Sequence, residues 1–127
     1  MEVLSHRGFW KTAVEKNKAV AFRHSFELKV GIETDVRDSL GQLVISHDPP
    51  TGGEMLFEHF LGIYTEYGLS LPLALNIKSD GLQMALKDIL NKYLVRNYFV
   101  FDMSIPDALL YKREDFNVFT RQSEYEK

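Results

Sequence analysis

Residues 30–48 read Val-Gly-Ile-Glu-Thr-Asp-Val-Arg-Asp-Ser-Leu-Gly-Gln-Leu-Val-Ile-Ser-His-Asp. In residues 30–36 apolar and charged side chains alternate with the two-residue period of a β-strand. One face of this strand carries Ile32, Thr34 and Val36. The other face carries Glu33, Asp35 and Arg37. The pattern predicts a strand with a packed side and a charged side, and in a barrel or at a cleft the charged side would line a site.

A turn and a second strand follow. Asp-Ser-Leu-Gly is a turn sequence, and Gln-Leu-Val-Ile-Ser is apolar enough to form the returning strand of a hairpin. A hairpin centred on this turn places Asp35 across from Ser46 and Glu33 across from Asp48. His47 then lies within reach of both carboxylates, whereas a slip of one residue would turn it to the opposite face.

The rest of the chain alternates between helical and strand-like patterns. Helices are expected where apolar residues recur every three or four positions: residues 18–29 with Asn17 as the N-cap and Gly31 as the stop, residues 55–67, residues 82–93 capped by Ser79 or Asp80, and residues 106–111. Further strands are expected at residues 3–4, 71–77, 98–103 and 117–121. This order predicts an α/β fold with a parallel sheet, in which functional residues collect at the carboxyl ends of the strands.

Composition limits the class of protein. The chain has 127 residues, of which 45% are hydrophobic and 26% charged, and its net charge is -3. It therefore forms one domain and carries no overall basic field for nucleic acid. It has no cysteine, which excludes disulfides and thiolate metal sites. We see neither a signal peptide at the N-terminus nor a run long enough to span a membrane, and we expect a cytoplasmic protein.

Short polar clusters at the predicted strand ends suggest chemistry. Ser5-His6-Arg7-Gly8 follows the first strand, Glu33 and Asp35 lie on the second, and His47 ends the hairpin. Two imidazoles can act as acid and base, two carboxylates can hold a hard cation, and an arginine can bind phosphate. Together they suit the cleavage of a phosphodiester. Simpler roles are also open, because Arg7 could be an ion-pair partner of Glu33 or Asp35.

The residues His6-Arg7-Gly8, Glu33-x-Asp35 and His47-Asp48-Pro49, with the segment 17–22, resemble the signature of the glycerophosphodiester phosphodiesterases. These belong to the phosphatidylinositol-specific phospholipase C-like phosphodiesterases. The resemblance implies a TIM-barrel-like fold, a role in lipid metabolism and a divalent cation, Mg²⁺ or Ca²⁺. It implies that His6 and His47 are the catalytic acid and base pair, and that Glu33 and Asp35 bind the metal. It suggests that Arg7 and Lys78 hold the substrate phosphate.

Two features depart from the family pattern. The resembling strand usually reads Glu-x-Lys, its glutamate being a third metal ligand, but here the residues are Asn76 and Lys78. An amide oxygen brings no charge, so it would bind a metal more weakly, and Asn76 could instead be a turn or capping residue. Lys78 could be a solvated strand-end lysine.

The second departure is length. A full (β/α)8 barrel takes about 250 residues, whereas this chain offers about five strands, the N-terminal half to two-thirds of such a barrel. We expect either the N-terminal part of a longer protein or self-association through open barrel edges. A non-catalytic domain that binds a phosphorylated ligand or a partner is the alternative to an enzyme.

Overall fold

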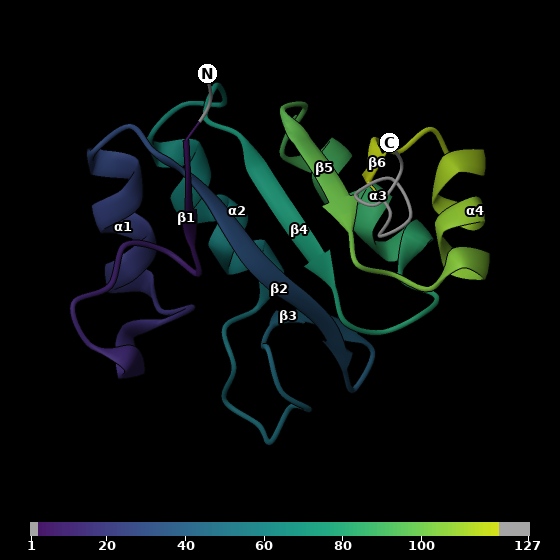
Figure 1. Ribbon diagram of the computed structural model, residues 1–127, viewed down its shortest axis with the longest axis horizontal. Coiled ribbons are helices and arrows are strands. Elements are labelled where there is room, and N and C mark those ends of the chain that lie inside the picture. The colour runs from purple at the N-terminus through teal and green to yellow at the C-terminus, as the bar shows by residue number, and fades with distance from the viewer. Residues whose placement is uncertain (1–2, 120–127) are drawn as a thin grey trace, which may run out of the picture.

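The computed structural model describes residues 3–119. Five strands form a parallel sheet in the order β1, β2, β4, β5 and β6, and β3 pairs antiparallel with β2 (Figure 1). The bounds of the strands are β1 Leu4–His6, β2 Gly31–Ser39, β3 Gln42–Ile45, β4 Leu73–Ile77, β5 Tyr98–Phe101 and β6 Val118–Phe119. The predicted strand 117–121 and the polar segment that follows extend beyond the described residues.

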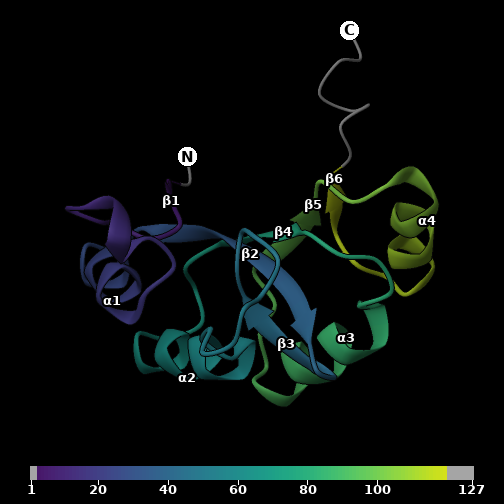
Figure 2. The same cartoon turned by 90° about the horizontal axis from the view of Figure 1, so that it is seen from below.

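The connections between the parallel strands contain helices, which gather on one side of the curved sheet (Figure 2). Their bounds are η1 Ala13–Glu15, α1 Ala19–Glu27, α2 Phe57–Glu66, α3 Gln83–Lys92 and α4 Ile105–Arg113. Parallel strands with helices on one side form part of a TIM barrel, as predicted. Within residues 3–119, no helix has both the length and the apolar character needed to cross a bilayer.

The core lies between the sheet and its helices. Alternate residues of β2 and β4 point into it, so Ile32, Val36 and Leu75 are fully buried. Helices α1 and α2 contribute aromatic rings to it: Phe60 stands edge-on to Phe22 with ring centroids 4.7 Å apart. The predicted apolar face of β2 therefore packs as expected, and the charged face is left for the opposite side of the sheet.

Helix boundaries differ from those expected at the caps. Lys18 is the N-cap of α1, and the side chain of Asn17 bonds elsewhere. The same helix ends before Gly31, because Lys29 adopts a left-handed conformation with φ 60° and turns the chain. Leu82, rather than Ser79 or Asp80, precedes α3 as its cap. These two helices lie where they were predicted, but the predicted N-caps, Asn17 for α1 and Ser79 or Asp80 for α3, are wrong.

The hairpin register is correct over part of its length. Val36 pairs with Ile45, and the backbone N–H of Ser46 donates to the carbonyl of Asp35 at 3.1 Å, as predicted. The expected pairing of Glu33 with Asp48 is wrong. Parallel strand β1 occupies that side of β2 instead and pairs His6 with Glu33. One side of β2 is thus shared, first by β1 and then by β3.

Gly31 lies where three elements meet. Its N–H donates to the carbonyl of Val3, and its carbonyl accepts from the hydroxyls of Ser5 and Ser25. The N–H of the next residue, Ile32, donates to the carbonyl of Pro72. A Cβ at this position would collide with the backbone and ring of Pro72. The absence of a side chain is therefore what allows β2 to start beside β4.

We expect Gly31→Ala to destabilise the protein by about 1–3 kcal/mol, because the backbone of Pro72 must move to admit the methyl group. Gly62→Ala is the matched control. Gly62 lies inside α2, and a Cβ added there would meet no atom within 4 Å. Alanine should therefore stabilise the protein by up to about 1 kcal/mol through helix propensity. Chemical denaturation of both variants measures this, and equal effects would contradict the packing described here.

Candidate active site

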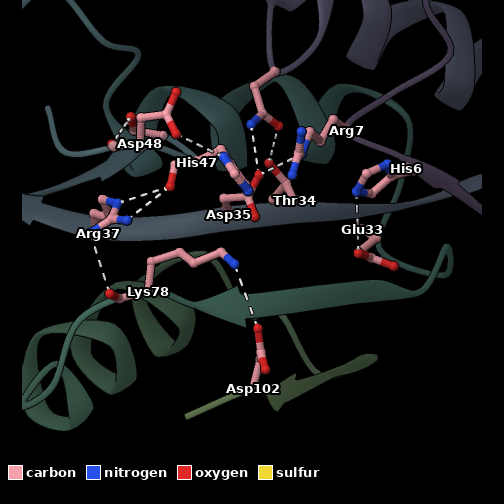
Figure 3. Close-up of polar contacts among 12 residues, drawn as sticks. His6, Arg7, Glu33, Thr34, Asp35, Arg37, His47, Asp48, Lys78 and Asp102 are labelled. Atoms are coloured by element: carbon pink, nitrogen blue, oxygen red, sulfur yellow. Dashed lines mark hydrogen bonds and ion pairs between the residues drawn. The ribbon is translucent and has the colours of Figure 1, made fainter.

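The predicted site residues collect at the carboxyl ends of the strands, on the face of the sheet opposite the core. Asp35 pairs in register with Asn76, so the two side chains project from the same face. Figure 3 shows the polar groups gathered along β2, with His6 beside Glu33 and Arg7 beside Asp35. His47 and Lys78 follow the ends of β3 and β4.

A buried ion pair lies at the centre of this group. Arg7 Nε lies 2.9 Å from Asp35 Oδ2, with the two side chains 18% and 2% exposed. The same carboxylate oxygen accepts from Asn17 Nδ2 at 3.0 Å, and Asn17 Oδ1 accepts from Thr34 Oγ1 at 2.6 Å. Such a buried charge needs partners of this kind. The ion-pair role that the sequence left open for Arg7 is therefore present.

The loop after β1 is held in a constrained conformation. Arg7 and Asn17 both have φ 58°, and the N–H of Asn17 donates to the carbonyl of Arg7 at 2.9 Å. The backbone N–H of Arg7 in turn donates to the backbone carbonyl of Glu33 at 2.6 Å. Left-handed backbone at a non-glycine residue persists only where its surroundings impose it. These bonds hold the backbone of Arg7 just after β1 and so fix the direction in which its side chain points.

The two imidazoles each lie near a carboxylate. His6 Nε2 is 3.6 Å from Glu33 Oε2, and His47 Nδ1 is 3.0 Å from Asp48 Oδ1. The His6 and His47 side chains are about half exposed, at 54% and 46%. A substrate could therefore reach both rings. Among the described residues the His47 ring contacts the carboxylate of Asp48, and its predicted reach to Glu33 and Asp35 stays a prediction.

Arg37 joins the ends of two strands. Its Nε and Nη2 donate to the carbonyl of His47 at 3.2 and 2.9 Å, and its Nη1 donates to the carbonyl of Lys78 at 3.3 Å. Figure 3 shows this fork between the two strand ends. It fixes the points from which two of the predicted site residues extend.

Lys78 is not a freely solvated lysine. Its Nζ lies 3.5 Å from Asp102 Oδ2, and the two side chains are only 19% and 17% exposed. Asp102 follows β5 in a left-handed conformation with φ 72°. The end of β5 therefore adds a carboxylate to the same edge of the sheet.

The donors present fit a hard cation, although weakly. Asn76 lies within β4, 8% exposed, and is neither a turn nor a cap. Its Oδ1 is buried without a hydrogen-bond partner among the described residues, so one oxygen is free for a ligand. No group of three or more His, Cys, Asp or Glu side chains in residues 3–119 could hold a metal ion. The amide of Asn76 offers one further side-chain oxygen on the same face as Asp35.

A cavity of about 730 Å³ opens beside the site. It lies between the loop after β1 and the loop that joins β3 to α2, and Arg7, Asn17 and His47 form part of its wall. Its size is that of a pocket for a small molecule. Trp10, on the loop after β1, is 36% exposed, and its Nε1–H donates to the carbonyl of His6 at 3.0 Å.

Sequence reasoning missed the supporting roles of Asn17 and Arg37. Asn17 looked like a helix cap, because the residue type and the position before an apolar stripe suit that role. Arg37 looked like part of a charged strand face. Neither sequence pattern indicates a partner on another strand, so only the tertiary structure shows these bonds.

Comparison with known proteins supports the fold. No protein-family model and no curated protein matches the chain. A provisionally named glycerophosphodiester phosphodiesterase from Galdieria sulphuraria matches with a TM-score of 0.78 and 18% identity, over 98% of this chain and 66% of that one. The glycerophosphodiester phosphodiesterase from Agrobacterium tumefaciens strain C58 matches with a TM-score of 0.69 and 19% identity, over 93% and 65%.

The chain thus spans about two thirds of the length of these two structures, at 66% and 65%. At 18–19% identity the likeness establishes the fold. The resemblance predicted from the sequence is confirmed at that level, as a TIM-barrel-like sheet of the kind found in glycerophosphodiester phosphodiesterases.

We expect Asn17→Ala to lower the free energy of unfolding by about 1–3 kcal/mol, because Asp35 and Thr34 lose their shared partner. Asn91→Ala is the control: the Asn91 side chain is exposed and accepts a long bond of 3.5 Å from Arg96, so its effect should stay within about 0.5 kcal/mol. Denaturant unfolding compares them. Similar losses in both variants would show that the Asn17 network adds nothing specific.

Proposed function

We propose that this chain carries the catalytic face of a metal-dependent phosphoric diester hydrolase that acts on a glycerophosphodiester-type substrate and releases an alcohol and glycerol phosphate. One observation supports this most directly. Two accessible imidazoles lie at the same sheet edge as a buried Arg7–Asp35 pair, in a fold shared with glycerophosphodiester phosphodiesterases. No other part of residues 3–119 combines these groups.

His6 and His47 supply the proton transfers. One imidazole starts neutral and takes the proton from the attacking oxygen. If that oxygen belongs to water, glycerol phosphate forms directly. If it belongs to a neighbouring hydroxyl of the substrate, a cyclic phosphate forms, and water then opens it with the two imidazoles in exchanged roles. The other starts protonated and gives its proton to the leaving alcohol oxygen as the P–O bond breaks. A hydrogen bond from His47 Nδ1–H to Asp48 leaves Nε2 to face the substrate.

Glu33, Asp35 and Asn76 would hold the divalent cation, Mg²⁺ or Ca²⁺, which when bound neutralises charge on the phosphate. The unpartnered Oδ1 of Asn76 supports this choice. Because Asp35 Oδ2 is already taken by Arg7 and Asn17, its other oxygen would face the ion. Two charges and one amide make a weaker site than three carboxylates.

Arg7 and Lys78 would bind the phosphate. Each is already paired with a carboxylate, Arg7 with Asp35 and Lys78 with Asp102, so its position is fixed before the substrate arrives. A positioned guanidinium or ammonium loses little freedom on binding an anion, which favours tight and oriented contacts.

The second candidate function is a non-catalytic domain that binds a phosphorylated ligand. Asn76 favours it, because an uncharged residue stands where the resembling family usually has a metal-binding glutamate. Both candidates use the same phosphate-binding groups, so they differ in turnover rather than in the ligand.

We expect His6→Ala and His47→Ala each to lower the turnover of glycerophosphodiesters by about 100-fold or more, because each removes a proton-transfer group. A chelator should abolish activity in the wild type. His24→Ala, on the outer helix α1, is the control and should keep wild-type turnover. Release of glycerol phosphate in a coupled assay is the measurement. Wild-type rates in both site variants would falsify the mechanism.

We expect Asn76→Asp to lower the concentration of Mg²⁺ or Ca²⁺ needed for half-maximal activity, because it adds a charge to the oxygen donors at the same length of side chain. Asn97→Asp, remote from the site at the start of β5, is the control for added charge. If the wild type and Asn76→Asp are both inactive but are still stabilised thermally by glycerol 3-phosphate, the binding function is supported instead.

A further inference from the structure

The wall of the 730 Å³ cavity carries charges that the proposed reaction does not use. The cavity shares Arg7 and His47 with the site, so a phosphodiester bound there would direct one of its two alcohols into this space. The other charged residues of the wall are Lys16, Lys18, Asp48 and Glu54.

The carboxylates of Asp48 and Glu54 contact neighbours within their own loop, residues 47–54. Glu54 accepts from the N–H groups of Thr51 and Gly52 at 2.8 and 3.0 Å and from the Thr51 hydroxyl at 3.2 Å. These bonds lower the pKa of Glu54 below its ordinary value. Asp48 faces His47. Both acids are therefore stabilised by neighbours within residues 47–54.

The two lysines have no such partners. In residues 3–119, no carboxylate lies within ion-pair distance of Lys16 or Lys18. Lys16 Nζ instead lies 4.4 Å from the centre of the Trp10 ring, which holds the ammonium group in place. Because Trp10 donates to His6, this ammonium is tied to the active-site loop.

The cavity does not suit a cationic group. Quaternary ammonium groups are recognised by aromatic faces, and the described residues of this wall include no Phe, Tyr or Trp. The neighbouring Trp10 face is already covered by Lys16. A positively charged alcohol would meet the ammonium groups of Lys16 and Lys18, whereas the two carboxylates of the wall are held by hydrogen bonds within residues 47–54.

The position of Lys18 is unfavourable for folding. It is the N-cap of α1, where no side chain caps the helix and where the first turn has no acidic residue. The amino end of a helix carries positive partial charge, so a lysine there destabilises and an acidic residue stabilises. A residue that breaks such a local rule often serves a function.

We infer that this cavity receives the alcohol portion of the substrate and selects a phosphodiester whose alcohol carries its own negative charge, such as a carboxylate or a second phosphate. Lys16 and Lys18 are the specificity-determining residues. The inference deepens the proposed function and rests on it, because the bound ester is a substrate only if the chain hydrolyses it. The preference for anions is a property of the cavity, and binding experiments can measure it without turnover.

The binding test uses three phosphate esters that need no turnover. Phosphocholine carries a cation, glycerol 3-phosphate a neutral alcohol and 3-phosphoglycerate a carboxylate. Titration calorimetry on the wild-type chain should rank 3-phosphoglycerate tightest and phosphocholine weakest. In the kinetic arm, glycerophosphoinositol 4-phosphate should be hydrolysed with a higher kcat/KM than glycerophosphocholine.

Lys18→Glu should weaken 3-phosphoglycerate relative to glycerol 3-phosphate by about 25-fold, because it changes the charge by two units and each unit at contact distance in water is worth about five-fold. It should also raise the unfolding temperature or leave it unchanged, because it improves the start of α1. Lys16→Ser should reduce the same preference. Lys112→Glu, on the exposed surface of α4, makes the same change in net charge and should leave the ranking unchanged.

The inference holds if the anion preference is present and falls in the two cavity variants but not in Lys112→Glu. It is overturned if the three esters bind equally, or if Lys18→Glu keeps the wild-type ranking. An inactive chain with the predicted ranking would overturn the proposed catalysis alone. An active chain without the ranking would overturn this inference alone.

Discussion

Strand β2 places apolar side chains on one face of the sheet and charged ones on the other, and both the core and the candidate site depend on that alternation. Ile32 and Val36 are fully buried against the helices, while Glu33 and Asp35 face the opposite side beside His6 and Arg7. A shift of one residue would exchange the two faces. The strand is held in register on both sides, by β4 on one and by β1 and β3 on the other.

Asp35 carries a buried carboxylate whose charge is balanced by neighbouring side chains. Its carboxylate is 2% exposed, so it stays in place only with compensation, and Arg7 and Asn17 provide it. The same pattern recurs at lower burial with Lys78 and Asp102. Paired groups are already oriented, and little further ordering is needed when a ligand arrives. The price is that any ligand must compete with an existing partner.

The sequence alone predicted the order of strands and helices, because the two-residue and 3.6-residue periods of the apolar residues are strong. It also predicted which clusters would meet, because parallel strands end at one edge. It could not predict that β1 would displace the hairpin beside Glu33, since that competition is between distant segments. For the same reason Asn17 read as a cap, although its side chain bonds across 18 residues to Asp35.

Arg37 binds the carbonyl of His47 and that of Lys78 with one guanidinium. Both outgoing loops are therefore held near their starts by the same guanidinium group. Residues farther along each loop could be lengthened, shortened or exchanged while these anchored ends keep their places. The fold thus separates the anchored strand ends from the loops beyond them, which is an arrangement through which one scaffold can acquire new substrates by exchange of loops.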